Sequence, residues 1–116
     1  MLITLLLLIL PSHQIVIEKQ PVIIQADVTR YSEKDSCHYV DCLTAAGIPP
    51  TEQTIACPRK YPLYTSVRIN GKDYICHDRT ALRYDGRWDI WTGYGEGSYQ
   101  EAIKFGKKSL AIQIIK

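Results

Sequence analysis

The sequence predicts a small, mainly β domain, either a β-barrel or an α+β fold. Short β-like runs separated by turn residues recur along the chain, one late segment has the pattern of a helix, and strands do not alternate with helices. A chain of 116 residues leaves room for one such domain, which excludes two packed domains and a barrel of eight βα units. The composition, 46% hydrophobic and 22% charged, is that of a folded globular protein.

Four segments have the pattern of strands: 21–31, 67–75, 87–91 and 109–115. The second segment contains Asn70-Gly71 between two β-like runs, and this dipeptide strongly favours a two-residue hairpin turn because both central positions need a positive φ. Asp85-Gly86 predicts another turn, directly before the alternating run RWDIW. The last segment is a strand rich in Ile.

One helix is predicted near the C-terminus. Ser98 and Glu101 have the spacing of a capping box, so the helix is expected to begin at Ser98. Gly106 is placed to end it, and the glycines at 93, 95 and 97 predict a flexible loop before it.

Residues 1–20 form an apolar segment followed by a short linker. The run from Leu2 to Leu10 is too short to span a bilayer but has the length of a signal-peptide core. No Lys or Arg precedes Lys19, and PSHQ offers no small-x-small cleavage site. We expect a signal peptide or anchor and a secreted protein; the alternative is an N-terminal strand before the β-like run Ile15–Ile17.

The four cysteines are Cys37, Cys42, Cys57 and Cys76. An even number in a small exported domain predicts two disulfides, for which the sequence allows three connectivities. A zinc site would use Cys37, His38, Cys42 and His77, but the Cys-x4-Cys spacing is loose and a second close pair is missing. The sequence therefore predicts disulfides and no metal.

Charge, motifs and aromatic content limit the classes of function that the sequence supports. Fourteen basic and twelve acidic residues give a net charge of +2, and the basic residues are spread along the chain, which argues against nucleic acid as a partner. No G-x-S-x-G motif for a serine nucleophile occurs. Asp78 and Asp89 lie in the aromatic-rich half of the chain, a combination suited to carbohydrate chemistry. The alternative is that the aromatic residues fill the core and that Asp78 pairs with Arg79.

Six segments resemble motifs of one known family, and they occur along the chain in the family's order. Thr54–Pro58 is similar to T-I-A-V-D-P, Tyr61–Ile69 to I-P-L-G-S-R-V-Y-I, Cys76–Thr80 to the E-D-T-G region, Gly86–Gly93 to G-x-x-x-D-I-Y, Gln100–Gly106 to E-E-A-L-x-W-G and Ala26–Tyr31 to V-T-A-Y. The interval of eleven residues from Asp78 to Asp89 equals the family's spacing. The family is the 3D (Asp-Asp-Asp) domain of bacterial cell-wall proteins, a six-stranded double-psi β-barrel. It is also the catalytic part of the membrane-bound lytic transglycosylase A family.

The resemblance implies a domain over 26–116 and a lyase that cuts peptidoglycan between N-acetylmuramic acid and N-acetylglucosamine. Asp89 matches the catalytic acid and base, and Asp78 matches the second Asp. The expected surroundings are His77, Arg79, Arg87, Trp88, Trp91 and Tyr94. The implied partner is the peptidoglycan glycan strand, with no cofactor, and the implied protein is a monomer of the cell envelope that meets the membrane only through its N-terminal segment.

Three departures from the family separate this chain from an ordinary member. Cys57 stands at the position of the first Asp, which implies bonds between Cys57 and Cys76 and between Cys37 and Cys42. Residues 79–82 lack the family's paired glycines, and the large insert domain of the membrane-bound enzymes is absent. A non-catalytic barrel that binds cell-wall glycan, or an envelope or virion component, therefore remains the alternative function.

Overall fold

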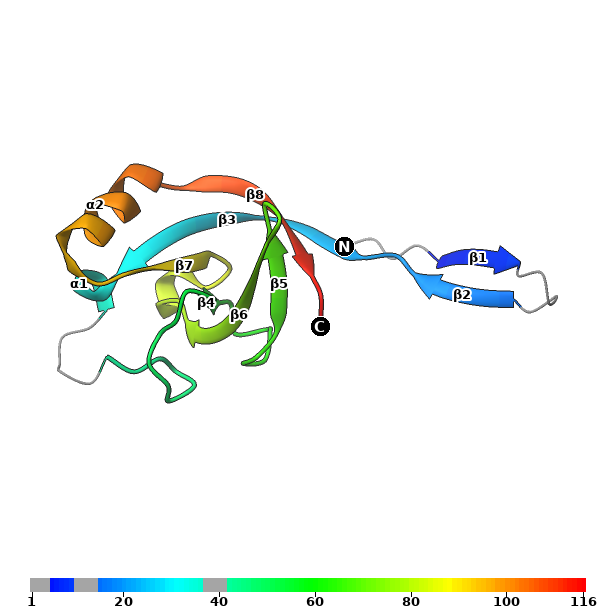
Figure 1. The fold of residues 1–116 in the computed structure, drawn as a ribbon, viewed down its shortest axis with the longest axis horizontal. Helices are drawn as coiled ribbons and strands as arrows, with labels where there is room; N and C mark the ends of the chain where they lie inside the picture. The colour runs from blue at the N-terminus through cyan, green and yellow to red at the C-terminus, as the bar shows by residue number, and fades with distance from the viewer. Residues whose placement is uncertain (1–4, 10–14, 37–41) are drawn as a thin grey trace.

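The computed structural model describes residues 5–9, 15–36 and 42–116 of the chain. A barrel lies at one end of the molecule, and the two strands β1 (Leu5–Ile9) and β2 (Ile15–Lys19) form an antiparallel hairpin at the other end (Figure 1). The described part of the N-terminal segment is thus extended, as in the strand alternative. Its role as a signal or anchor, and the domain boundaries, stay predictions.

Six strands close the barrel in the order β3-β7-β4-β6-β5-β8. Their bounds are β3 Val22–Ser32, β4 Thr54–Cys57, β5 Ser66–Ile69, β6 Lys72–Arg79, β7 Trp88–Gly93 and β8 Lys108–Ile114. The pairs β3–β7 and β4–β6 are parallel, whereas the other four pairs are antiparallel. The predicted mainly β fold, a small six-stranded barrel with one late helix, is confirmed.

Alternate residues along the strands fill the barrel. The interior cluster includes Val28, Ile55, Trp88, Ile90 and Ile112, all buried. Because strand side chains alternate between faces, Thr29, Ala56 and Asp89, each next to an interior residue, point to the outer face. The interior therefore fixes which residues the outer face presents.

The hairpin at Asn70-Gly71 forms as predicted. Strands β5 and β6 pair up to Ile69 and Lys72, and the two turn residues have φ values of 50° and 79°. Both lie in the left-handed region that Asn and Gly tolerate best.

A disulfide joins Cys57 of β4 to Cys76 of β6, with 5.7 Å between their Cα atoms. Both residues are fully buried inside the barrel. This is the bond that the family resemblance implies. Cys37 lies outside the described residues, so the Cys37–Cys42 bond stays a prediction.

The late helix begins earlier than the capping box predicts. Helix α2 covers Gly95–Phe105, so Gly95 and Gly97 belong to it rather than to a flexible loop. The short helix α1 (Glu33–Ser36) explains the difference, because Glu33 Oε1 accepts a hydrogen bond from the N–H of Gly95 at 2.5 Å. That bond satisfies a donor at the helix start, while the Ser98 hydroxyl donates to the carbonyl of Thr92 instead. The helix ends at Gly106, as predicted, with φ 65°.

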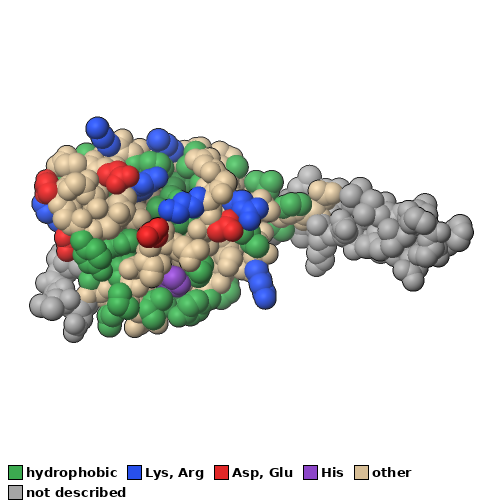
Figure 2. Space-filling model, viewed as in Figure 1, with side chains coloured by type: hydrophobic (Ala, Val, Ile, Leu, Met, Phe, Trp, Pro, Cys, Tyr) green, Lys and Arg blue, Asp and Glu red, His purple; other side chains and the backbone are tan. Residues whose placement is uncertain are grey.

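Charged side chains of both signs are interspersed over the face seen in Figure 2, without a large patch of one sign. This distribution fits the small net charge of the chain. Neither described α-helix has the length and apolar character needed to cross a bilayer.

Candidate functional site

A groove of about 500 Å³ on the outer face of the barrel contains both predicted catalytic acids, Asp78 and Asp89. The strand pairing explains why they meet there. Ala56 of β4 is the register partner of Asp78 on β6 and of Asp89 on β7. Thr29 of β3 pairs with Asp89 in turn. The four residues therefore form one row across four strands, with Ala56 between the two acids.

A β-bulge selects Asp78 for this row. Along the parallel pair β4–β6, Ile55 faces Cys76, but the next residue, Ala56, faces Asp78. His77 is the extra residue of the bulge. Its side chain is buried, and its Nδ1 lies 2.9 Å from the hydroxyl of Thr54. The bulge thus brings the second acid, and not the neighbouring histidine, beside Ala56.

Asp89 has one carboxylate oxygen engaged. The hydroxyl of Thr29 donates to Oδ1 at 3.0 Å, and within the described residues Oδ2 has no hydrogen-bond donor. Burial raises the pKa of Asp89 to about 6, and the negative charges of Asp35 and Asp78 act in the same direction. The hydrogen bond from Thr29 and the charge of Arg87 lower the pKa, but burial outweighs them.

Asp78 has both carboxylate oxygens engaged. Oδ1 accepts from the backbone N–H groups of Ala45 (3.0 Å) and Arg79 (2.9 Å), and Oδ2 accepts from the phenol of Tyr31 (2.9 Å). The bond from Ala45 fastens the 42–50 segment against the barrel. Asp78 is therefore a fixed acceptor, whereas Asp89 keeps an oxygen for a ligand.

Tyr31 and Trp91 pack on the outer face beside the two acids. They are register partners on β3 and β7, and their rings meet edge to face with centroids 5.3 Å apart. With Ala56 they form a small buried cluster separate from the barrel interior. Burial, followed by the charge of Asp78, raises the pKa of the Tyr31 phenol, so it stays protonated and donates to Asp78.

The two predicted arginines of the site have different surroundings. The guanidinium of Arg79 donates to the backbone carbonyls of Pro58 (3.1 Å) and Tyr61 (2.6 Å), and it lies 3.1 Å from Cys57 Sγ. Arg79 thus secures the chain after β4. The guanidinium of Arg87 lies 4.3 Å from the ring of Tyr84 and lines the groove.

Four predicted site residues do not line this groove, and one of them, Trp91, lines two other hollows of the surface instead. His77 is held at Thr54, as described above. Trp88 is 1% exposed and packs in the barrel interior against Tyr61, so its ring faces the core. Tyr94 is 55% exposed and contacts Trp91 edge to face at 5.2 Å, in an adjoining hollow.

Sequence reasoning missed several residues that line the groove: Thr29, Tyr31, Asp35, Ala56, Arg83 and Tyr84. Three of them, Thr29, Tyr31 and Ala56, lie in segments that carry the family resemblance. Nothing in their residue types marks them as site residues, because their role comes from strand register.

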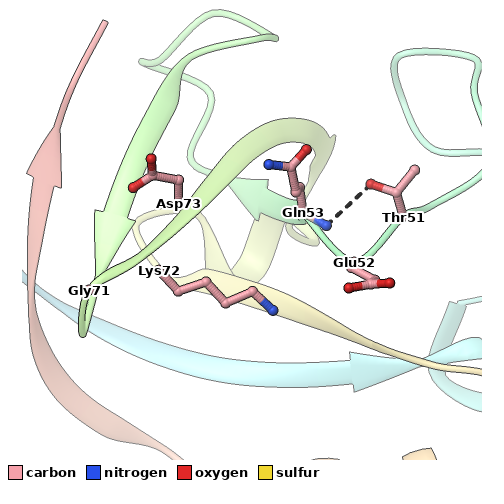
Figure 3. Close-up of a pocket in the computed structure, with 6 residues that line it drawn as sticks. All are labelled: Thr51, Glu52, Gln53, Gly71, Lys72 and Asp73. Atoms are coloured by element: carbon pink, nitrogen blue, oxygen red, sulfur yellow. Dashed lines mark hydrogen bonds between the residues drawn. The ribbon is translucent and has the colours of Figure 1, made fainter.

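A second hollow, of about 660 Å³, lies near the β5–β6 turn (Figure 3). Lys72 extends across it toward Glu52, and the backbone N–H of Gln53 donates to the hydroxyl of Thr51. None of the predicted site residues lines this hollow. In the described parts of the chain, no group of three or more His, Cys, Asp or Glu residues is arranged to hold a metal ion.

No protein-family model matches the sequence, and no curated protein matches it. Among solved structures, the chain is similar to the lytic transglycosylase MltA of E. coli. An apo form of an alanine variant aligns over 89% of this chain and 30% of its own, with a TM-score of 0.55 and 12% identity. A second crystal structure of MltA from E. coli aligns over 89% and 31%, with a TM-score of 0.54 and 13% identity. The chain thus spans under a third of these neighbours' length, and the similarity shows a lytic transglycosylase-like fold.

Proposed function

We propose that the protein is an exported lytic transglycosylase that cleaves peptidoglycan, with Asp89 as the single acid and base. The observation that carries this proposal is the state of Asp89, a half-buried carboxyl with a pKa of about 6, one oxygen held by Thr29 and the other available to a ligand. A general acid with a pKa near the working pH exists in both forms that the reaction needs. The neighbours' printed name, lytic transglycosylase, supports the same chemistry.

The proposed reaction has two proton transfers. Protonated Asp89 gives its proton to the glycosidic oxygen between N-acetylmuramic acid and N-acetylglucosamine as the C1–O bond breaks. The resulting carboxylate removes the proton of the sugar's C6 hydroxyl, while O6 bonds to C1 and closes a 1,6-anhydro ring. Asp89 ends protonated, as it began, so a second catalytic carboxylate is not required. Asp78 is assigned to hold Tyr31 and the 42–50 segment beside the reacting sugar.

We also propose that the protein is exported and that its barrel is a double-psi barrel of the 3D type. The buried Cys57–Cys76 disulfide supports an oxidising compartment, and the apolar N-terminal segment supports secretion to the cell envelope. We assign residues 26–116 to a 3D-type double-psi barrel and residues 1–20 to the signal or anchor. Pairing of β3 with β8 from Val22 onward extends the barrel strand slightly before that boundary.

A second candidate function is a barrel that binds glycan, or an envelope or virion component, without cleaving it. Cys57 favours this alternative, because a buried disulfide sulfur stands where the family has its first acid.

The test is incubation of the purified protein with peptidoglycan, followed by mass spectrometry of the fragments. Anhydro-muropeptides from the wild type, with at least a hundredfold loss in Asp89→Asn, are expected from the usual contribution of a general acid. Asp73→Asn is the matched control, because Asp73 is an exposed carboxylate paired with Arg68 on another part of the barrel. Binding without product indicates the second function. Product from Asp89→Asn at the wild-type rate contradicts the role of Asp89.

A further inference from the structure

The rim of the groove carries two arginines that the proposed reaction does not use. Arg83 belongs to the 3-10 helix η1 (Leu82–Tyr84), and Arg87 follows the turn directly before β7. Both guanidinium groups lie against the ring of Tyr84, at 4.9 Å for Arg83 and 4.3 Å for Arg87. We call Arg83, Tyr84 and Arg87 the arginine rim.

The backbone of the arginine rim is held in place. The N–H of Tyr84 donates to the carbonyl of Ala81, and the N–H of Arg87 donates to the carbonyl of Tyr84. Asp85, between the two arginines, accepts from the N–H of Arg59 at 2.9 Å and forms an ion pair with its guanidinium. The rim is thus tied to the chain that follows β4, and stacking on Tyr84 restricts both arginines further.

Neither rim guanidinium has a hydrogen-bond acceptor in the described parts of the chain. The arginines that form ion pairs there are Arg30, Arg59 and Arg68, and Arg79 binds backbone carbonyls. Besides its contact with the Tyr84 ring, Arg87 has a longer-range electrostatic interaction with Asp89. A guanidinium carries five donors in a planar fork that suits a carboxylate, so two such groups packed on the same ring form an anion-binding surface.

The same groove separates charges of opposite sign. Asp78 and Asp89 repel an anionic group from the row on β6 and β7, and Asp35 of α1 adds to this repulsion from the α1 side. Arg83 and Arg87 attract it to the rim. A ligand that fits this pattern has a neutral group beside the two acids and a carboxylate at the arginine rim.

We propose that Arg83 and Arg87 bind a carboxylate on the glycan, the lactyl carboxylate that N-acetylmuramic acid carries where its stem peptide has been removed, and so select peptide-free stretches of the strand and their position in the groove. This inference rests on the proposed function, because it names a substituent of the proposed substrate. It assigns the rim a role in recognition and leaves proton transfer to Asp89.

The test compares two tetrasaccharides of alternating N-acetylglucosamine and N-acetylmuramic acid. One carries free lactyl carboxylates, and the other carries them as neutral methylamides of nearly the same shape. Binding is measured by calorimetry in the Asp89→Asn background, so that the ligand is not consumed. We expect the carboxylate form to bind about tenfold more tightly, since a charge-assisted hydrogen bond contributes enough free energy for that ratio.

Replacing both rim arginines (Arg83→Gln with Arg87→Gln) should lower the affinity for the carboxylate form to that for the methylamide. The double Arg→Lys variant keeps the charge without the fork and should retain part of the preference. Arg68→Gln, an exposed arginine outside the groove, is the matched control and should leave the ratio unchanged. Circular dichroism of each variant verifies folding.

Equal binding of the two tetrasaccharides overturns the inference, as does a preference that survives removal of both rim arginines. The outcome is separable from that of the proposed function. Cleavage without the preference contradicts the rim alone, and the preference without anhydro products contradicts the enzyme alone. Failure of both tetrasaccharides to bind contradicts the two together.

Discussion

Asp78 and Asp89 are register partners of the same residue, Ala56, and therefore lie two strands apart on the outer face of the barrel. The usual spacing of strands places their Cα atoms about 10 Å apart. Their hydrogen bonds differ although their positions are equivalent. Three donors occupy both oxygens of Asp78, whereas among the described residues Thr29 alone donates to Asp89. This difference supports the proposed assignment of the acid to Asp89 and of a structural role to Asp78.

The raised pKa of Asp89 predicts a pH-dependent effect of Asp89→Asn on stability. The folded-state pKa of about 6 lies above the unfolded value of 3.8, so the folded protein binds more protons between these values and loses stability as pH rises through that window. Asn carries no charge to bury. We expect Asp89→Asn to be more stable than the wild type at pH 8, by up to about 3 kcal/mol, with the gain vanishing near pH 3.

Urea unfolding of both proteins from pH 3 to pH 8 measures this gain. Asp73→Asn is the control of opposite sign, because the hydrogen bond from Arg68 lowers the pKa of the exposed Asp73. Its carboxylate stabilises the fold only above the unfolded pKa, and that contribution is lost as pH falls. A gain for Asp89→Asn that is the same at every pH contradicts the burial of this carboxyl.

Removing the phenol of Tyr31 is expected to destabilise the fold. Tyr31→Phe leaves Asp78 Oδ2 without its donor in a half-buried site, which costs about 1–3 kcal/mol. Tyr64→Phe is the control, since Tyr64 is 57% exposed and its ring contacts His77, while its phenol has no hydrogen bond to any described residue. Denaturant unfolding at pH 7 measures both. Equal stability of the two variants contradicts a structural role for the Tyr31–Asp78 bond.

Much of the fold was predictable because it depends on local chemistry. The dipeptide Asn70-Gly71 favours a two-residue turn by itself, and the RWDIW run alternates polar and apolar residues as a half-buried strand does. Gly106 ends α2 because the residue after the helix has a positive φ, which glycine adopts most easily. The start of α2 was not predictable in this way. It depends on Glu33, which is more than sixty residues away in sequence and reaches the helix only in the folded chain.

In the candidate site, too, some residues were predictable from local sequence and others depend on the folded structure. The two acids were predictable because the sequence interval between Asp78 and Asp89 equals that of the family that the chain resembles. Their surroundings depend on which face of each strand a residue occupies, and the bulge after Ile55 changes this face for His77. A shift of one residue moves a side chain to the opposite face of a sheet. His77 and Trp88 were expected in the groove because they are next to Asp78 and Asp89 in the sequence, but their side chains lie elsewhere.

The Cys57–Cys76 bond is expected to contribute substantially to stability. It closes a sequence separation of 19 residues, for which the loss of unfolded-state entropy corresponds to about 3 kcal/mol. Peptide mapping under non-reducing conditions should recover the two residues in one linked fragment, and Cys57→Ala with Cys76→Ala should unfold at lower urea. Recovery of Cys57 linked to another cysteine, or a double variant as stable as the wild type, contradicts the expected contribution.

Two glycines should respond to alanine with opposite signs. Gly71 has φ 79° at the β5–β6 turn, where a side chain costs about 1–2 kcal/mol even though a Cβ there meets no atom within 4 Å. Gly97 lies inside α2 with a φ outside the positive range and similar open space, so alanine should stabilise the fold by about 0.5–1 kcal/mol through its helix propensity. Each is therefore the other's control, because the added methyl group is the same and only the backbone conformation differs. Thermal unfolding followed by circular dichroism measures both changes. Destabilisation of similar size in the two variants would place the cost in lost space rather than in φ, and it would contradict the assignment of Asn70-Gly71 to a left-handed hairpin turn.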